Sequence, residues 1–368
     1  MGYRSLHACI NDLEKNGFLI RIKEEVDPYL EMSAIQLRVF QEEGKAVFFE
    51  KVKGSTFPAV SNLFGTLEQS RFIFRDTIEN VKKLVSLKAD PISALKKPWI
   101  HLSAIASARM ALPKKVSSHS FNEIQISDFP QIQCWPMDGG AFITLPQVYS
   151  EDIDSPGVMK SNLGMYRVQL NGNDYITNHE IGMHYQIHRG IGVHQSKSNA
   201  RNQPLKVSIF VGGPPAHTLA AVMPLPEGMS ELSFAGVMGG RRFRYTNEDG
   251  YTLSTEADFV ICGEINADDV KPEGPFGDHL GYYSLTHDFP VMRVDKVYAK
   301  KDAIWPVTVV GRPPQEDSQF GALIHEITDS IIPAEIPGII AVNAVDEAGV
   351  HPLLLAIGSE RYTPYNPE

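Results

Sequence analysis

The most informative stretch of the sequence is Pro-Glu-Gly-Pro-Phe-Gly-Asp-His-Leu-Gly-Tyr-Tyr, at residues 272–283. Within this stretch, a segment rich in proline and glycine separates two carboxylates, Glu273 and Asp278. Proline lacks a backbone N–H, and glycine adopts conformations that other residues avoid, so we expect a shaped loop instead of a regular helix or strand. Two carboxylates and His279 in such a loop are typical of a functional site. A polar turn with incidental charges is the alternative.

The composition is that of an ordinary globular protein, with 43% hydrophobic and 21% charged residues among 368. A formal net charge of −10 argues against nonspecific binding to nucleic acid or to an anionic membrane surface. Three scattered cysteines without a CxxC pair favour a reducing, cytoplasmic location. The longest uncharged run, 207–226, contains several prolines and glycines, which argues against a transmembrane helix.

Alternating helical and strand-like patterns predict an N-terminal α/β domain over residues 1–125. Its expected elements are helices at 5–17, 31–43 and, in pieces, 66–111, with strands at 18–20 and 46–49. A β-rich domain over 126–315 follows, with strands at 158–170, 206–211, 258–264, 291–298 and 304–310 and short helices at 217–222 and 230–238. The last segment, 316–368, contains a predicted helix at 318–332 that leads into an apolar segment at 338–342, and a run at 352–357 that we expect to be buried.

A second polar group lies upstream, in Asn-Leu-Gly-Met-Tyr-Arg at 162–167. If this segment is extended, Asn162, Gly164 and Tyr166 point to one side, and Met165 and Arg167 point to the other. An arginine in a strand that faces a pocket is costly unless it meets a carboxylate, a phosphate or a ligand. We therefore expect Arg167 to have such a partner.

Two further signals point to a metal ion. The histidines 179, 184, 188 and 194 crowd a short stretch, but nearby glycines disfavour the helix that would align His184 with His188, and the cluster alone is a weak metal signal. Glu231 begins a predicted helix with Ser230 as its cap, and it is either a favourable charge at a helix N-terminus or a hard oxygen ligand. Asparagine and glutamate oxygens with one imidazole suit Mn²⁺ or Mg²⁺ bridging a phosphate.

Six ordered motifs carry a family resemblance: Gly-Ala-Phe-Ile-Thr-Leu-Pro at 140–146, Asn-Leu-Gly-Met-Tyr-Arg at 162–167, His-Arg-Gly at 188–190, Leu-Ser-Phe-Ala-Gly at 232–236, Glu-Gly-Pro-Phe-Gly-Asp-His-Leu-Gly-Tyr-Tyr at 273–283, and Gly-Arg-Pro-Pro at 311–314. Together they resemble the UbiD family of reversible decarboxylases that use prenylated FMN. The resemblance implies an α/β (α+β) protein in which an N-terminal α/β domain precedes a β-rich split-barrel flavin-binding domain. It also implies that 316–368 begins a C-terminal α/β domain, which we expect to be truncated.

The resemblance assigns roles to particular residues. It implies that Asn162, His188 and Glu231 hold Mn²⁺ against the cofactor phosphate, with K⁺ as a second expected ion. The catalytic set would be Arg167, which orients the substrate carboxylate, Glu273, which pairs with it, and Asp278, which donates the proton that replaces CO₂. The implied flavin contacts are Met165, Tyr166, Arg167, His184, Tyr185, Gln186, Arg189 and Gly190, although several family members carry arginine where this chain has His184.

The implied function is that of a carboxy-lyase, a reversible non-oxidative decarboxylase of an aromatic or α,β-unsaturated carboxylic acid. The family default substrate is 4-hydroxy-3-polyprenylbenzoate, in biosynthesis of the ubiquinone or menaquinone type. The expected partners are this small-molecule acid, a flavin prenyltransferase that supplies the cofactor, and further copies of the chain in a homo-oligomer. We expect no nucleic acid, and membrane contact only if the substrate is polyprenylated. The alternatives are a non-catalytic flavin- or phosphate-binding module or assembly subunit and, third, a Mn²⁺ hydrolase.

Overall fold

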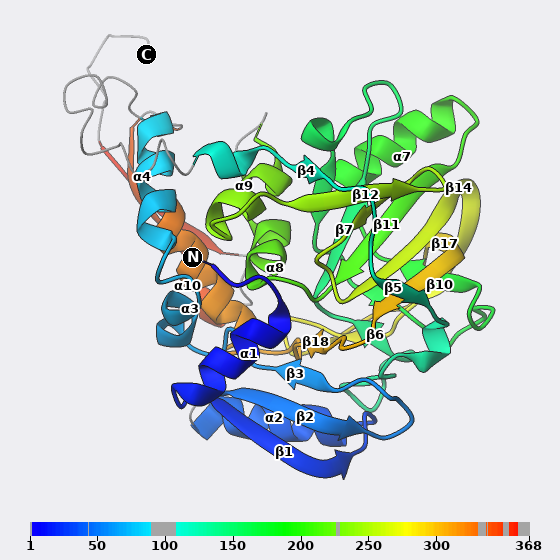
Figure 1. The fold of residues 1–368 in the computed structure, drawn as a ribbon, viewed down its shortest axis with the longest axis horizontal. Coiled ribbons are helices and arrows are strands. Elements are labelled where there is room, and N and C mark those ends of the chain that lie inside the picture. The colour runs from blue at the N-terminus through cyan, green and yellow to red at the C-terminus, as the bar shows by residue number, and fades with distance from the viewer. Residues whose placement is uncertain are drawn as a thin grey trace.

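The computed structural model describes residues 2–42, 44–89, 108–225, 229–329, 336, 338–348 and 353–359, without the side chains of 86–89. Within these ranges, a four-stranded sheet and a nine-stranded sheet dominate the fold, and helices pack against them (Figure 1). The predicted class, a mixture of helices and sheets with a curled half-barrel sheet, is confirmed. Every helix in the described ranges is too short or too polar to span a bilayer.

The N-terminal part contains the predicted helices. The first, α1 (Leu6–Lys15), begins where predicted because the Ser5 hydroxyl accepts a hydrogen bond from the Ala8 N–H at 3.2 Å. One face of α1 is buried and carries its apolar side chains, Leu6, Cys9, Ile10 and Leu13. The other helices are α2 (Glu31–Glu42), α3 (Leu67–Ile73), α4 (Ile78–Ala89) and the short η2 (Ala108–Ala111). The part of the prediction that falls on residues 90–107 lies outside the described residues.

The smaller sheet has the strand order β1-β2-β3-β18, with β1 (Leu19–Val26), β2 (Ala46–Val52), β3 (Ala59–Ser61) and β18 (Trp305–Val307). The predicted strand at 304–310 is therefore a member of the N-terminal sheet, where it pairs in parallel with β3. The Trp305 ring lies 4.7 Å from the ring of Phe129 and 5.1 Å from that of Phe259. The Phe57 ring lies 4.9 Å from the Phe259 ring, so the domains predicted at 1–125 and 126–315 share a core, and the boundary between them stays a prediction.

The larger sheet has the strand order β6-β9-β10-β17-β14-β11-β7-β8, and β5 pairs with β17. Its strands are β5 (Phe121–Glu123), β6 (Phe142–Ile143), β7 (Pro146–Ser150), β8 (Asn162–Gly164), β9 (Val168–Gln169), β10 (Glu180–Met183), β11 (Leu205–Val211), β14 (Phe259–Glu273) and β17 (His287–Lys300). The predicted strands at 206–211, 258–264 and 291–298 are confirmed as β11, β14 and β17, and the last two are longer than predicted.

The single strand predicted at 158–170 is wrong, because two short strands with a break between them replace it. The short helix η4 (Val158–Lys160) comes first, β8 pairs with β7, and β9 pairs with β6 and β10. These two strands lie toward opposite ends of the sheet, yet only Met165, Tyr166 and Arg167 connect them. Such a connection spans at most about 14 Å. The sheet must therefore curl to bring its ends together, and these three residues lie at the seam.

The loop predicted over 272–283 is wrong at its start. Pro272 and Glu273 are the last residues of β14, where Glu273 pairs with His287 of β17. Proline is tolerated near the end of a strand because few ladder hydrogen bonds are lost there. The chain then turns at Gly274, which has a φ of +89° and so lies in the left-handed region that favours glycine. A two-stranded ladder of β15 (Phe276–Gly277) and β16 (Tyr283–Ser284) follows.

Helices cover the larger sheet and link it to the N-terminal part. They are α7 (Gly190–Ala200), α8 (Pro215–Val222), α9 (Glu231–Met238) and α10 (Glu316–Thr328). The predictions for α8 and α9 are confirmed, and α10 begins two residues before its predicted start and packs against α3 and α4. The remaining elements are η3 (Ile126–Asp128), β4 (Lys114–Lys115), β12 (Arg244–Glu248) and β13 (Tyr251–Ser254), the last three forming a small sheet.

The last described segment corrects one prediction. The hairpin of β19 (Ile339–Ala344) and β20 (Leu354–Gly358), with η5 (Asp346–Ala348) between them, is seen near the C-terminal end of the chain in Figure 1. The side chains of Leu354, Leu355 and Ile357 are exposed, so the expected burial of 352–357 is wrong for these residues. Among the described strands, β20 pairs only with β19.

Candidate active site

Arg167 and Glu273 form a bidentate ion pair at the seam of the half barrel. The Arg167 Nε donates to Glu273 Oε1 at 2.8 Å, and Nη2 donates to Oε2 at 2.9 Å. The Glu273 side chain is 0% exposed and that of Arg167 is 10% exposed. A buried charge pair of this kind requires close geometry, because both groups lose their hydration. The curl of the sheet supplies that geometry: Arg167 precedes β9, and Glu273 ends β14.

Asp278 completes the predicted catalytic set. The Arg167 Nη1 donates to Asp278 Oδ2 at 3.0 Å, and Nη2 also donates to the Ser284 hydroxyl at 3.0 Å. The ring of Phe276 lies below the guanidinium, with its centroid 4.5 Å from the Arg167 Cζ. Asp278 is 35% exposed, in contrast to Glu273. The structure therefore brings all three predicted catalytic residues together and leaves Asp278 as the carboxylate that solvent or a ligand can reach.

Glu273 has a second polar partner that the sequence analysis did not assign to it. His184 Nδ1 lies 3.0 Å from Glu273 Oε2, and its ring lies 4.1 Å from the ring of Phe289. Burial alone would raise the pKa of Glu273, but hydrogen bonds from His184 and Arg167 outweigh burial and hold this pKa below its ordinary value. Glu273 is therefore the permanent anion of the site, and it fixes the arginine.

Two residues of the predicted metal set lie near Tyr166 at the seam. The Asn162 amide donates to the Tyr166 hydroxyl at 3.5 Å, and the charge of Glu231 acts on the same hydroxyl. Burial raises the pKa of Glu231, which begins α9, and hydrogen bonds from backbone N–H groups oppose that rise. The predicted cap Ser230 occupies the N-cap position, but its hydroxyl makes no capping hydrogen bond.

The third member, His188, is exposed, and no contact joins it to the other two. Of the other histidines, His194 is buried in α7 and its Nδ1 lies 2.9 Å from the Ser150 hydroxyl. Across the part of the chain that the structure describes, no three His, Cys, Asp or Glu side chains gather as metal ligands. The Asn162, His188 and Glu231 set stays a prediction.

The start of α7 has the features of an anion-binding helix end. Its N-cap Arg189 makes no side-chain capping hydrogen bond. A Cβ at Gly190 would stand 2.0 Å from the Asn162 Oδ1, so a larger residue would require the Asn162 side chain to move. The helix dipole favours a phosphate at such a position. The residues around Gly190 therefore fit the phosphate end of a flavin nucleotide.

The remaining predicted flavin contacts lie around this seam with different exposures. The Met165 N–H donates to the Ala221 carbonyl at 2.9 Å, which ties the seam to α8. Tyr185 is buried and its hydroxyl donates to the Gln195 side chain of α7 at 2.9 Å, whereas Gln186 is exposed. The rings of Tyr166 and Tyr185 lie 6.0 Å apart. Contact between any of these side chains and a flavin stays a prediction.

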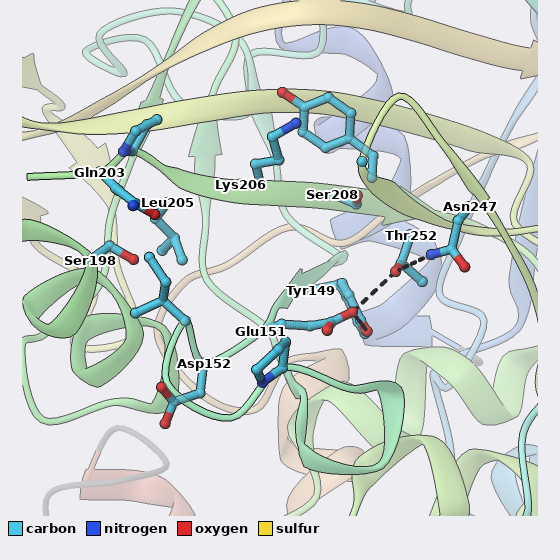
Figure 2. Close-up of a pocket in the computed structure, with 15 residues that line it drawn as sticks. Tyr149, Glu151, Asp152, Ser198, Gln203, Leu205, Lys206, Ser208, Asn247 and Thr252 are labelled. Atoms are coloured by element: carbon cyan, nitrogen blue, oxygen red, sulfur yellow. Dashed lines mark hydrogen bonds between the residues drawn. The ribbon is translucent and has the colours of Figure 1, made fainter. Parts of the chain in front are cut away.

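A cavity of about 620 Å³ lies away from the predicted site, among α7, β7, β11 and the β12–β13 hairpin (Figure 2). Its polar groups bind one another, since Glu151 Oε1 accepts hydrogen bonds from the hydroxyls of Tyr149 at 2.6 Å and Thr252 at 3.1 Å. The predicted catalytic, metal and flavin residues are not among those that line it. This cavity is therefore separate from the site at the seam.

The curled sheet and the buried arginine–carboxylate site define a mixed α/β protein organised around a half barrel. Residues 10–88 match the 3-octaprenyl-4-hydroxybenzoate carboxy-lyase N-terminal domain. Residues 106–313 match the 3-octaprenyl-4-hydroxybenzoate carboxy-lyase Rift-related domain. The chain belongs to the UbiD family, as its motifs predicted.

A curated relative and two solved structures illustrate the family. A 4-hydroxybenzoate decarboxylase subunit of Chlamydia pneumoniae is 40% identical over 351 residues, which cover 94% of this chain and 59% of that protein. The vanillic acid decarboxylase of Sedimentibacter hydroxybenzoicus in its closed form has a TM-score of 0.81 at 24% identity, covering 99% of this chain and 76% of that one. An evolved dimeric form of the UbiD-class enzyme HmfF from Pelotomaculum thermopropionicum, in complex with prFMN, has a TM-score of 0.76 at 20% identity, covering 98% and 80%.

The sequence relatives and the solved structures support different conclusions. The chain spans about three-fifths of the length of the chlamydial relatives that it matches, 62% and 59% for two of them. The identities to the solved structures are low, so those structures establish the shared fold. The relatives thus establish the family and the architecture that holds Arg167, Glu273 and Asp278.

Proposed function

We propose that the protein is a reversible non-oxidative decarboxylase of an aromatic or α,β-unsaturated carboxylic acid and that it uses prenylated FMN. The observation that carries this proposal is the Arg167 guanidinium held by buried Glu273 and by partly exposed Asp278. An arginine fixed in this way presents a preorganised charge to a substrate carboxylate. Membership in the UbiD family and the prFMN complex of the HmfF structure support the same assignment.

Each residue of the set has one task in the proposed reaction. Prenylated FMN, when bound, supplies the electron sink for the carbanion left by loss of CO₂. Arg167 orients the substrate carboxylate, and Glu273 keeps the guanidinium in place as a permanent anion. Asp278, the exposed member, delivers the proton that replaces CO₂ on carbon and withdraws it again in the reverse direction.

The cofactor residues are part of the proposal. Asn162, His188 and Glu231 would hold Mn²⁺ at the cofactor phosphate, because their oxygen and imidazole donors suit this ion, and K⁺ would be a second ion. The start of α7 at Gly190, beside Asn162, supports a phosphate there through the helix dipole. The flavin itself would be held by the predicted contact residues, Met165, Tyr166, Arg167, His184, Tyr185, Gln186, Arg189 and Gly190.

The proposed partners follow from this chemistry. They are a small-molecule carboxylic acid, a flavin prenyltransferase as supplier of the cofactor, and further copies of the chain. The name of the chlamydial relative, a subunit, supports an assembly and also the alternative of an assembly subunit that binds flavin without turnover. A 4-hydroxy-3-polyprenylbenzoate substrate, with the membrane contact that it would require, and a cytoplasmic location stay predictions.

The test is co-expression of the full chain with a flavin prenyltransferase, followed by purification with Mn²⁺. Mass spectrometry and absorption spectroscopy measure the occupancy of prenylated FMN, and a panel of hydroxybenzoic and acrylic acids is screened for CO₂ release. We expect near-stoichiometric cofactor and CO₂ release from at least one of the acids. A protein that carries the cofactor but releases no CO₂ from any acid favours the assembly subunit, and a protein without cofactor contradicts the proposal.

A further inference from the structure

The turn that follows Glu273 is held by side chains that lie outside the predicted catalytic set. Gln169 in β9 is 0% exposed, and its Oε1 accepts a hydrogen bond from the Gly274 N–H at 2.8 Å. Its Nε2 donates to the Asn171 carbonyl at 2.9 Å. Both ends of this buried amide are therefore occupied, and one of them binds the backbone directly after the buried carboxylate.

Arg167 and Gln169 bind two consecutive residues, Glu273 at the end of β14 and Gly274 directly after it. Arg167 directly precedes β9 and Gln169 is its last residue, so the two residues are two positions apart, the spacing that places side chains on one face of extended backbone. Arg167 binds the side chain of Glu273, and Gln169 binds the backbone of Gly274. The same short segment thus fixes both the carboxylate and the main chain from which it projects.

Other groups hold the rest of the turn. The Asn173 Nδ2 donates to the carbonyls of Pro272 at 2.9 Å and Gly274 at 3.0 Å. The Gly139 N–H donates to the Pro275 carbonyl at 2.8 Å, and a Cβ at Gly139 would stand 2.1 Å from the Gly274 oxygen. No space is left for the turn to shift toward residue 139.

The far end of the turn is held as well. Asp138 is buried, and its Oδ1 accepts from the Gly277 N–H at 2.8 Å, while its Oδ2 accepts from the Trp135 N–H at 2.9 Å. The backbone between Glu273 and Asp278 is therefore bound at residues 274, 275 and 277. The spacing of the two carboxylates follows from this bracing and not from their own contacts alone.

We propose that Gln169 is a positioning residue, which keeps Glu273 on Arg167 by fixing the Gly274 backbone, with Asn173 as its support. The consequence for turnover rests on the proposed function, but the positioning itself does not. A glutamine that only satisfied a buried backbone group would stabilise the fold without affecting the strength of the Arg167–Glu273 pair.

The test is a double-mutant cycle on the full chain, with urea unfolding as the measurement. The coupling between Arg167→Met and Glu273→Gln is determined with the native glutamine and again with Gln169→Met. We expect Gln169→Met to lower the coupling constant about tenfold. The matched control is Gln147→Met, since Gln147 is also 0% exposed in the same sheet and donates to the Gly212 carbonyl at 2.9 Å. This control should destabilise the fold and leave the coupling unchanged.

A second variant covers the case in which Gln169→Met does not fold. Asn173→Gly removes two contacts to the turn from an exposed position, and glycine tolerates the φ of +44° at this residue, so the fold should persist. We expect faster amide exchange over residues 272–278 and a smaller Arg167–Glu273 coupling. An unchanged coupling in either variant overturns the positioning role, whatever the turnover. Absence of CO₂ release from the native protein, with the coupling effect intact, contradicts only the proposed function.

Discussion

Removing Arg167 should be among the most costly single substitutions in this chain. In Arg167→Met, the fully buried Glu273 carboxylate loses both of its guanidinium hydrogen bonds and retains only His184. Breaking a buried ion pair by deleting one partner costs about 3–5 kcal/mol, because an unpaired charge stays buried. We therefore expect the free energy of unfolding to fall by about 3–5 kcal/mol.

The assay is urea unfolding, followed by tryptophan fluorescence, of the native chain, Arg167→Met, Glu273→Gln and the double variant. The double variant should recover part of the loss, since the buried charge is then absent. The matched control is Arg293→Met, which breaks the pair that the exposed Arg293 makes with Asp269 at 2.7 and 3.0 Å and should cost much less than Arg167→Met.

The pH dependence follows from the sign of the Glu273 pKa shift. In the folded native chain the pKa of Glu273 lies below its ordinary value. Ionised Glu273 therefore stabilises the fold at pH values above the ordinary pKa, and this stabilisation is lost as the pH falls through the lower pKa of the folded chain. Without Arg167, burial dominates and raises the pKa, so Arg167→Met should gain stability relative to the native chain as the pH is lowered. A cost no larger than that of Arg293→Met, with no pH dependence, would refute this account of the pair.

Three further predictions concern other parts of the fold. Burial raises the pKa of Glu316 to about 7, so its ionisation destabilises the folded state as the pH rises from 5 to 8. Glu316→Gln should therefore be more stable than the native chain by up to roughly 3 kcal/mol at pH 8 but not at pH 5, and equal urea midpoints at pH 8 would contradict this. Gly190→Ala places a Cβ 2.0 Å from the Asn162 oxygen and should lower the free energy of unfolding by about 1–3 kcal/mol, whereas Gly321→Ala, which meets open space in α10, should be neutral or stabilising by thermal unfolding. His184→Phe keeps a ring but removes the hydrogen bond to the buried Glu273 carboxylate, so the free energy of unfolding in urea should fall by about 1–3 kcal/mol. An unchanged urea midpoint would show that this hydrogen bond does not stabilise the fold.

Local patterns in the sequence predicted those parts of the fold that local physics determines. The helix α1 was predicted from the Ser5 cap and one apolar face, and both features are present. The strands β11, β14 and β17 were predicted from apolar, β-branched runs. The grouping of Arg167, Glu273 and Asp278 was predicted from family motifs, because their separation in sequence gives no local signal of contact.

The predictions that failed depend on tertiary structure. The break at Met165–Arg167 arises because β8 and β9 pair at opposite ends of one curled sheet, which no local periodicity encodes. The placement of β18 in the N-terminal sheet has the same origin. Gln169 was missed because it binds a backbone amide, whose position the sequence does not mark. Its location two residues after Arg167 is the signal that could have suggested it.

The measurement that tests the central claim most directly is CO₂ release by cofactor-loaded protein, compared among the native chain, Glu273→Gln, Asp278→Asn and the control Asp269→Asn. Asp269 is also a partly exposed carboxylate paired with an arginine, but its partner Arg293 is 61% exposed, whereas Arg167 is 10% exposed. The account predicts that Glu273→Gln and Asp278→Asn retain prenylated FMN and lose turnover, while Asp269→Asn behaves like the native chain. Native rates of CO₂ release from Glu273→Gln and Asp278→Asn would contradict it.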